Sequence, residues 1–265
     1  MIKKFLSILI LFVFFTFMYV IFFFDINDYK KNFENIISKK ANIELSINGN
    51  LDLDVGLNSK IQATKLTVKK NDILLLQSEV FRASVSISEI FNGIFDIKSI
   101  SLINSKLYGI NIDERIIQVY NALAGRRYPS NNSQYSSIEL ITARGYFQKE
   151  FLNIDNITIK TELLEGNGFG KINPTTESIN ISSNTFIRND KKLIEKYNQF
   201  YPKYLIDTQL PMLFTGSYTN PIVDIKISEI VTQKLKDEIK NRAIESITDK
   251  IKDKIQSEIN SKLPF

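Results

Sequence analysis

The sequence contains no cysteine, no histidine and no tryptophan. Without cysteine the chain has no disulfide, no thiolate metal ligand and no cysteine nucleophile, so cysteine usage does not indicate its redox compartment. Without histidine it lacks the usual general base near neutral pH and the most common metal ligand. A Ser-His-Asp triad is impossible, and a metal site would need carboxylates alone. These absences disfavour most classes of enzyme.

Glycine is also sparse, with 10 residues in a chain of 265. The densest group, GNGFG at 166–170, lacks the G-x-G-x-x-G spacing and opens a strand-like run. We interpret it as a hairpin or as a stripe of small residues on one sheet face, not as a phosphate loop. No pair of carboxylates has a spacing typical of acid–base chemistry. We therefore predict a protein that is not an enzyme and that has no cofactor and no metal site.

The charge of the chain is modest, with a formal net value of +5. Its lysines are scattered among aspartate and glutamate, which is the pattern of a solvated surface. No basic patch with interleaved aromatic residues is present, so we predict no nucleic-acid partner.

One long hydrophobic run is present, FLSILILFVFFTFMYVIFFF at 5–24, which contains no charged residue. As a helix it would span about 30 Å, the thickness of the hydrocarbon layer of a bilayer. A cleaved signal peptide is the alternative, but its apolar region is usually shorter and ends in small residues, whereas this run ends in Phe-Phe-Phe-Asp. The sequence predicts a single transmembrane anchor over 1–27.

The orientation of this anchor in the membrane depends on the charges on its two sides. Lys3 and Lys4 precede the run, but four lysines follow it within 16 residues, so a simple count of positive charges points the wrong way. Long translocated domains largely escape that rule, and the short tail is typical of a signal anchor. We expect the N-terminus in the cytoplasm and the body outside it.

The body, residues 28–227, is predicted to be mainly β. A short helix over 28–40 begins at Asp28, which can cap it. Strands follow over about 42–112 and 137–227, separated by a polar loop near residue 128, and Asn48-Gly49 is a strong signal for a two-residue hairpin. Residues 190–204 are expected to form a short helix or a packed loop. The chain would thus form about a dozen short strands, in an antiparallel sheet with one apolar face.

The alternation of apolar and polar residues selects a set of side chains for the apolar face. These candidates are Ile43, Leu45, Ile47, Leu51, Leu53, Val55, Ile100, Leu102, Ile110, Ile112, Met212, Phe214, Val223 and Ile225.

After residue 227 the pattern becomes helical, which predicts an amphipathic segment over 228–265. Its apolar residues recur mainly every fourth position, so on a helix the stripe drifts by about 40° at each step. Two amphipathic helices packed on the domain's own surface would explain this pattern, and contact with a membrane surface or a partner is the alternative. The face comprises Val231, Leu235, Ile239, Ile247, Ile251, Ile255, Ile259 and Leu263.

Taken in order along the chain, these segments resemble the AsmA family of bacterial envelope proteins. The resemblance covers residues 1–113, with the anchor, DINDYK and ELSINGNLDLDV, and residues 137–265, with the G-x-G turn, LPMLFTGSYTNPIVDI and the terminal amphipathic helix. The chain departs from the family in length, because the long β-rich middle of typical members is nearly absent. The glycine usual before ELSI is also replaced by Ala41-Asn42.

The resemblance implies an anchor in the bacterial inner membrane and a body in the periplasm. It also implies a long, curved antiparallel sheet, the β-taco, whose apolar groove carries phospholipid toward the outer membrane during outer-membrane biogenesis. A dozen strands would make a sheet of about 60 Å, which is short for crossing a periplasm. The expectation is therefore a short lipid conduit acting with partners, and the alternative is a scaffold for the assembly of outer-membrane proteins or for envelope integrity.

Overall fold

A computed structural model describes residues 25–54, 58–86, 96–129, 133–234, 236, 237, 240 and 252. The helical elements are η1 (Ile26–Tyr29), α2 (Lys30–Ala41), α4 (Ile112–Leu123), α5 (Lys191–Tyr197), η2 (Asn198–Phe200) and η3 (Lys203–Leu205). The strands are β1 (Glu44–Ile47), β2 (Leu51–Asp54), β3 (Asn58–Lys70), β4 (Ile73–Ser86), β5 (Asp96–Tyr108), β6 (Tyr135–Gln148), β7 (Phe151–Thr161), β8 (Leu164–Asn173), β9 (Ser178–Ile187), β10 (Leu210–Ser217) and β11 (Asn220–Ile225).

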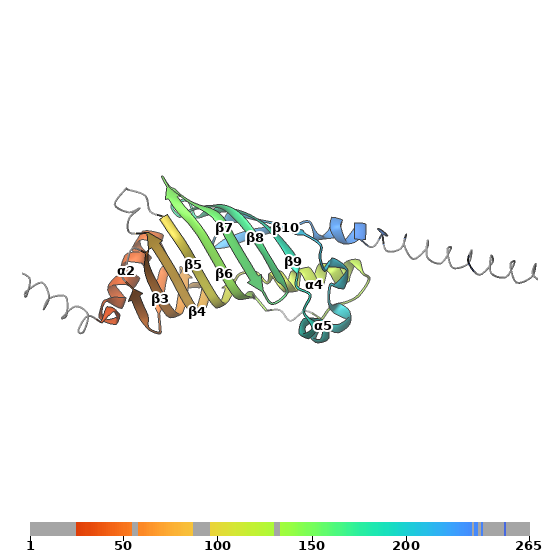
Figure 1. Cartoon of the computed structure of the whole chain (residues 1–265), viewed down its shortest axis with the longest axis horizontal. Coiled ribbons are helices and arrows are strands. Elements are labelled where there is room, and N and C mark those ends of the chain that lie inside the picture. The colour runs from red at the N-terminus through yellow and green to blue at the C-terminus, as the bar shows by residue number, and fades with distance from the viewer. Residues whose placement is uncertain are drawn as a thin grey trace, which may run out of the picture.

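The strands form a single antiparallel sheet (Figure 1). Its order is β1-β3-β4-β5-β6-β7-β8-β9-β10-β11, with β2 also paired to β3, so every strand from β3 onward lies beside its successor in sequence. Such a meander needs no crossover helices, which agrees with the alternating pattern of the sequence. The prediction of a mainly β protein with one large antiparallel sheet is confirmed, and within the described residues this sheet has 11 strands and is not closed.

The predicted hairpin at Asn48-Gly49 is wrong. Strands β1 and β2 do not pair with each other; both pair with β3, side by side along its length. The amides of Asn48 and Gly49 donate to the carbonyl oxygens of Lys65 and Thr64, at 3.0 Å each. A Cβ at position 49 would lie 2.1 Å from the Thr64 hydroxyl oxygen. The glycine therefore allows close approach to β3 and not a reversal of the chain.

A crease runs across four neighbouring strands. Lys65, Glu79, Asn104 and Glu139 lie at the same level of β3, β4, β5 and β6, and each is left out of the paired register. Lys65 and Asn104 have positive φ angles of 52° and 49°, a conformation that L-residues seldom adopt. The alternation of side chains shifts by one residue at this line, so that positions 63 and 66 both face the same side. Interruptions of this kind bend a strand and increase its twist.

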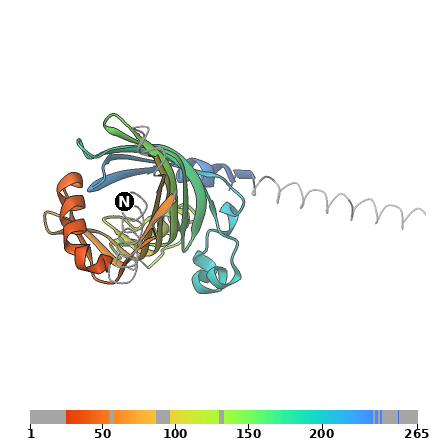
Figure 2. The same cartoon turned by 60° about the vertical axis from the view of Figure 1, so that its left-hand side comes forward.

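The sheet is strongly curved. Figure 2 shows it curling so that its first strands, in orange, and its last strands, in blue, approach each other. One face is therefore concave, and we define the concave face as the side that carries Ala63, Ile157 and Met212.

The helices differ from the prediction in two respects. The first helix begins as the turn η1, which is capped by the side chain of Asp25, not of Asp28, and continues as α2 to Ala41. Helix α4 occupies residues where the sequence had predicted the end of a strand and the start of a loop. The expected short helix in 190–204 is present as α5, followed by η2 and η3.

The predicted anchor over 1–27 and the segment 228–265 lie largely outside the described residues. In the part of the chain that the structure describes, no helix is both long and apolar enough to cross a membrane. Residues 227–234 are helical and directly follow the last strand.

Candidate functional site on the concave face

Three rows of mainly apolar residues, with several glycines and with Ser183 and Thr185, cross the concave face from strand to strand. Since residues paired in register point to the same side of a sheet, the ladder identifies the members of each row. The first row is Ala63, Phe81, Leu102, Ile141, Ile159, Gly166, Thr185 and Leu210. The second is Ile61, Ala83, Ile100, Ala143, Ile157, Gly168, Ser183, Met212 and Ile225. The third is Ile97, Gly145, Ile154, Gly170, Ile181, Phe214 and Val223.

The opposite, convex face is polar at the same level. The row between the first two is Gln62, Arg82, Ser101, Thr142, Thr158, Asn167, Asn184 and Pro211. Elsewhere the convex face also carries exposed apolar side chains, among them Phe169, Leu213 and Ile222. The concave face differs in having apolar residues in several consecutive rows, so it is the side with the most apolar surface to remove from water.

Glycines on the concave face permit its tight curvature. Gly166, Gly168 and Gly170 alternate along β8, so all three point to this face. A Cβ on any of them would lie between 2.2 and 2.4 Å from a backbone carbonyl oxygen of β9. Side chains at these positions would therefore force the two strands apart. This arrangement is the small-residue stripe that the GNGFG segment had suggested.

The middle of the concave face is buried by the curvature of the sheet. Ile154, Ile157 and Ile159 on β7 are only 7–9% exposed. They pack with half-buried Ile141, Ala143, Leu152, Ile172 and Ile181 of the adjoining strands β6 to β9. Every member of this cluster belongs to the sheet itself, so the curled strands shield it without a covering helix.

Helix α2 covers the N-terminal end of the concave face. Phe33 packs with Ile26 of η1 against a cluster formed by Ile47, Leu51, Ala63 and Leu66. Two side-chain bonds hold the helix in place, because Glu34 accepts from the amide of Ile47 at 2.6 Å and Ser38 accepts from the amide of Leu45 at 3.0 Å.

Helix α4 covers the opposite, C-terminal end. Ile116, Ile117 and Tyr120 are at most 1% exposed. They belong to a cluster that includes Leu164, Ile187, Leu210 and Met212, all at the ends of concave-face strands. Their spacing on α4 places them on one side of the helix. The two ends of the concave face are thus filled by side chains from different helices.

The start of α4 is fixed by capping. The side chain of Asn111 accepts from the amide of Glu114 at 3.1 Å, and Asp113 and Glu114 occupy the first turn. Both features stabilise a helix N-terminus, the first by satisfying a free amide and the second by complementing the helix dipole.

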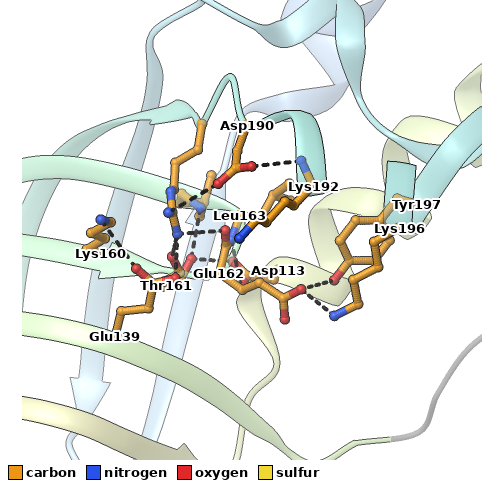
Figure 3. A network of polar contacts seen from close by, with 12 residues as sticks. Asp113, Glu139, Lys160, Thr161, Glu162, Leu163, Asp190, Lys192, Lys196 and Tyr197 are labelled. Carbon is orange, nitrogen blue, oxygen red and sulfur yellow. Dashed lines mark hydrogen bonds and ion pairs between the residues drawn. The ribbon is translucent and has the colours of Figure 1, made fainter. Parts of the chain in front are cut away.

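A network of polar contacts joins α4 and α5 to the turn between β7 and β8 (Figure 3). Asp113 accepts from the Thr161 hydroxyl at 2.6 Å and from the Leu163 amide at 3.2 Å. Glu162 accepts from Lys196 and from the Tyr197 hydroxyl, both on α5.

Arg188 connects the other side of this network to the sheet. Its Nη1 lies 2.6 Å from a carboxylate oxygen of Glu139 and donates to the carbonyl oxygens of Thr161 and Glu162 at 2.8 and 3.0 Å. These contacts join the end of β9 to β6 and to the turn between β7 and β8, which Asp113 of α4 contacts from the other side.

Burial perturbs the titration of this network. Desolvation raises the pKa of Asp113 to about 6, although the hydrogen bonds from Thr161 and Leu163 act in the opposite direction. Desolvation also raises the pKa of Tyr197, and the nearby carboxylate of Glu162 adds to that effect. The region is therefore a low-dielectric structural junction.

A cavity of about 650 Å³ opens beside the junction. Its lining includes Asp113, Glu162 and Lys196 together with Tyr128 and Tyr197. Because these charged groups line it, the cavity is not suited to a hydrocarbon chain.

Most of the residues predicted for the apolar face do lie together on the concave face. Ten of them lie on the concave face by register, namely Leu45, Ile47, Leu51, Leu53, Ile100, Leu102, Met212, Phe214, Val223 and Ile225. Ile43 lies just before β1, and Val55 lies outside the described residues.

Two of the predicted positions belong to the region of α4 and not to the sheet. Ile112 is the first residue of α4, is buried at 3% exposure, and belongs to the cluster under that helix. Ile110 lies between β5 and α4 and packs against the same cluster. Both residues therefore fill the C-terminal end and do not belong to the ladder. The physical reason is the Asn111 cap, which turns the chain into a helix immediately after β5.

The C-terminal amphipathic face is described only at its start. Ile227 and Val231 are buried in the same cluster as α4. Leu235, Ile239, Ile247, Ile251, Ile255, Ile259 and Leu263 lie outside the residues whose side chains are described.

Sequence reasoning missed helix α4 and the crease. The signal for α4 was available, because Asn111 followed by Glu114 is typical of a capping box and the apolar spacing then becomes helical. The crease depends on four strands lying in register, and no local motif indicates it.

Comparison with protein-family models, with curated proteins and with solved structures yields no match to this chain.

Proposed function

We propose that this protein binds phospholipid through acyl chains held on the concave face of its sheet. The observation that carries the proposal is the set of three mainly apolar rows that cross the concave face of the curved sheet from strand to strand. Apolar surface of this extent has to be buried, and in this fold the concave side can contact a flexible hydrocarbon chain along its length.

The dimensions suit the hydrocarbon chains of one lipid molecule. The clusters under α2 and α4 occupy the two ends, so acyl chains would bind between them, over the isoleucine cluster in the middle of β5 to β8. Four strands spaced about 4.8 Å apart span roughly 20 Å, and one leaflet of a bilayer contributes about 15 Å of hydrocarbon. The protein would therefore hold lipids singly, and would act as a short carrier and not as a continuous conduit.

The cellular setting follows from the hydrophobic run at 5–24 and from the resemblance to the AsmA family. We place the protein in the bacterial inner membrane with a single anchor, its N-terminus in the cytoplasm and its body in the periplasm. Its role would be to contribute to outer-membrane biogenesis, together with partner proteins of the envelope. The net charge of +5 suits contact with anionic lipid headgroups.

A scaffold for outer-membrane assembly is the second candidate. It is favoured by the low exposure of Ile154, Ile157 and Ile159, which are already shielded in the curled sheet. In that case the concave face would serve only as the protein's own hydrophobic core.

Site-specific photo-crosslinking separates the two functions. A photoreactive amino acid at position 157 points into the concave face, and the same residue at position 158 points to the convex face of the same strand. In membranes that contain radiolabelled phospholipid, lipid binding predicts strong labelling from position 157 and little from position 158. Equal labelling, or labelling from position 158 alone, would contradict the proposal. Protein adducts from both positions without lipid would favour the scaffold.

A further inference from the structure

An ion pair fastens the curled sheet to itself between the end of β3 and the turn that follows β8. Lys70 ends β3, and Glu177 lies in the turn between β8 and β9, 107 positions away. The Lys70 ammonium donates to the Glu177 carboxylate, and Lys70 is only 8% exposed. Its nitrogen lies 5.4 Å from the centre of the Tyr218 ring, and the Tyr218 amide donates to the Glu177 carbonyl oxygen at 2.9 Å. We call these three residues the clasp.

The clasp crosses the open side of the sheet. Five strand-to-strand steps separate β3 from β8 along the ladder, and at about 4.8 Å each they would cover roughly 24 Å in a flat sheet. Direct contact therefore requires the sheet to curl back on itself. The crease at Lys65 and Asn104 contributes to this bend. It divides β3, β4 and β5, and the turn between β3 and β4, where Lys70 lies, is on the far side of it.

The clasp consists of side chains and one turn, and it is not part of the ladder. In the described part of the chain, the hydrogen-bonded order runs from β1 to β11 without returning to its start. Two hairpin tips held by a few polar contacts can separate without breaking a strand pair, whereas opening elsewhere would break whole ladders. The hydrogen bond from Lys70 to Glu177 also raises the pKa of the Lys70 ammonium.

The closed form leaves little access to the centre of the concave face, since Ile154, Ile157 and Ile159 are 7–9% exposed. We propose that the clasp of Lys70, Glu177 and Tyr218 is a gate, and that its opening admits the acyl chains of a phospholipid to the concave face. The gate rests on the proposed lipid-binding function and assigns to these residues the control of lipid exchange.

The absence of cysteine makes a direct test possible. The double variant Lys70→Cys/Glu177→Cys would contain two thiols only, and a short cleavable bis-maleimide would lock the clasp. The matched control is Thr158→Cys/Asn167→Cys, which replaces an exposed hydrogen-bonded pair of 2.8 Å between β7 and β8 on the convex face, away from the clasp. The full chain, in mild detergent, is loaded with a pyrene-labelled phosphatidylglycerol, and exchange is followed after addition of unlabelled lipid.

The gate predicts that the locked clasp slows exchange by roughly tenfold or more, that cleaving the linker restores the rate, and that the locked control exchanges like the wild type. The variant Lys70→Met should exchange faster, and the charge-swapped pair Lys70→Glu/Glu177→Lys should return toward the wild-type rate. Bound lipid that exchanges equally fast with the clasp locked and unlocked would overturn the gate and leave lipid binding intact. A wild-type chain that retains no pyrene lipid would overturn the lipid function itself, and the gate with it.

Discussion

The hydroxyl of Thr161 donates a 2.6 Å hydrogen bond to the carboxylate of Asp113, which joins the end of β7 to the first turn of α4. Both residues are buried. The contact determines where α4 lies over the C-terminal end of the concave face, and it places an ionisable group in a region of low dielectric. Its consequences for stability can be measured.

Replacement of Asp113 by asparagine should change how stability depends on pH. Burial raises the pKa of Asp113 from 3.8 to about 6, so the folded state binds this proton more tightly than the unfolded state. Protonation of Asp113 therefore stabilises the folded state. This contribution is complete below about pH 4 and is lost as the pH rises to about 6. At about 1.4 kcal/mol per pKa unit, the wild type should lose about 3 kcal/mol relative to Asp113→Asn between these limits.

Chemical denaturation of both proteins at a series of pH values measures this difference. Subtracting the two curves removes the effect of other titrating groups. A difference in the free energy of unfolding that stays constant from pH 4 to pH 7 would contradict the assignment of a raised pKa to Asp113.

Removal of the Asn111 cap should weaken α4. The Asn111 side chain accepts from the Glu114 amide at 3.1 Å, and its loss in Asn111→Ala leaves a helix donor without a partner. We expect a destabilisation of about 0.5–2 kcal/mol. The variant Asn111→Ser keeps an oxygen that can cap and should recover most of this loss. Equal stability of the alanine and serine variants, measured by denaturation, would show that capping is not the cause.

A methyl group at Gly168 should oppose the curvature of the sheet. In Gly168→Ala the new Cβ would lie 2.4 Å from the carbonyl oxygen of Ser182, so β8 and β9 must move apart. We expect a loss of about 1–3 kcal/mol, typical of overpacking. The control Glu165→Ala changes an exposed residue of the same strand, and should stay within about 0.5 kcal/mol of the wild type. An alanine at position 168 that leaves stability unchanged would mean that the curvature does not depend on this stripe.

Much of the fold could be predicted from the sequence because alternation is a local property. Ile100 and Leu102 on β5, and Met212 and Phe214 on β10, lie on the concave face, as their spacing of two residues requires. The Asn48-Gly49 signal failed because its local turn preference competes with two backbone hydrogen bonds to β3, which form only in the folded sheet. The positions of α4 and the clasp depend on contacts between residues far apart in sequence, such as Asp113 with Thr161 and Lys70 with Glu177. Periodicity carries no information about such pairs.

The number of phospholipid molecules bound per chain tests the central claim most directly. The full-length protein is extracted from bacterial membranes in mild detergent and examined by native mass spectrometry, beside the variants Ile157→Asp and Thr158→Asp. Lipid binding on the concave face predicts about one diacyl phospholipid per wild-type chain, retained by Thr158→Asp and lost in Ile157→Asp, because a charge in the apolar row is costly to bury. A wild-type chain that carries no phospholipid, or an Ile157→Asp chain that is folded and carries as much as the wild type, would contradict it.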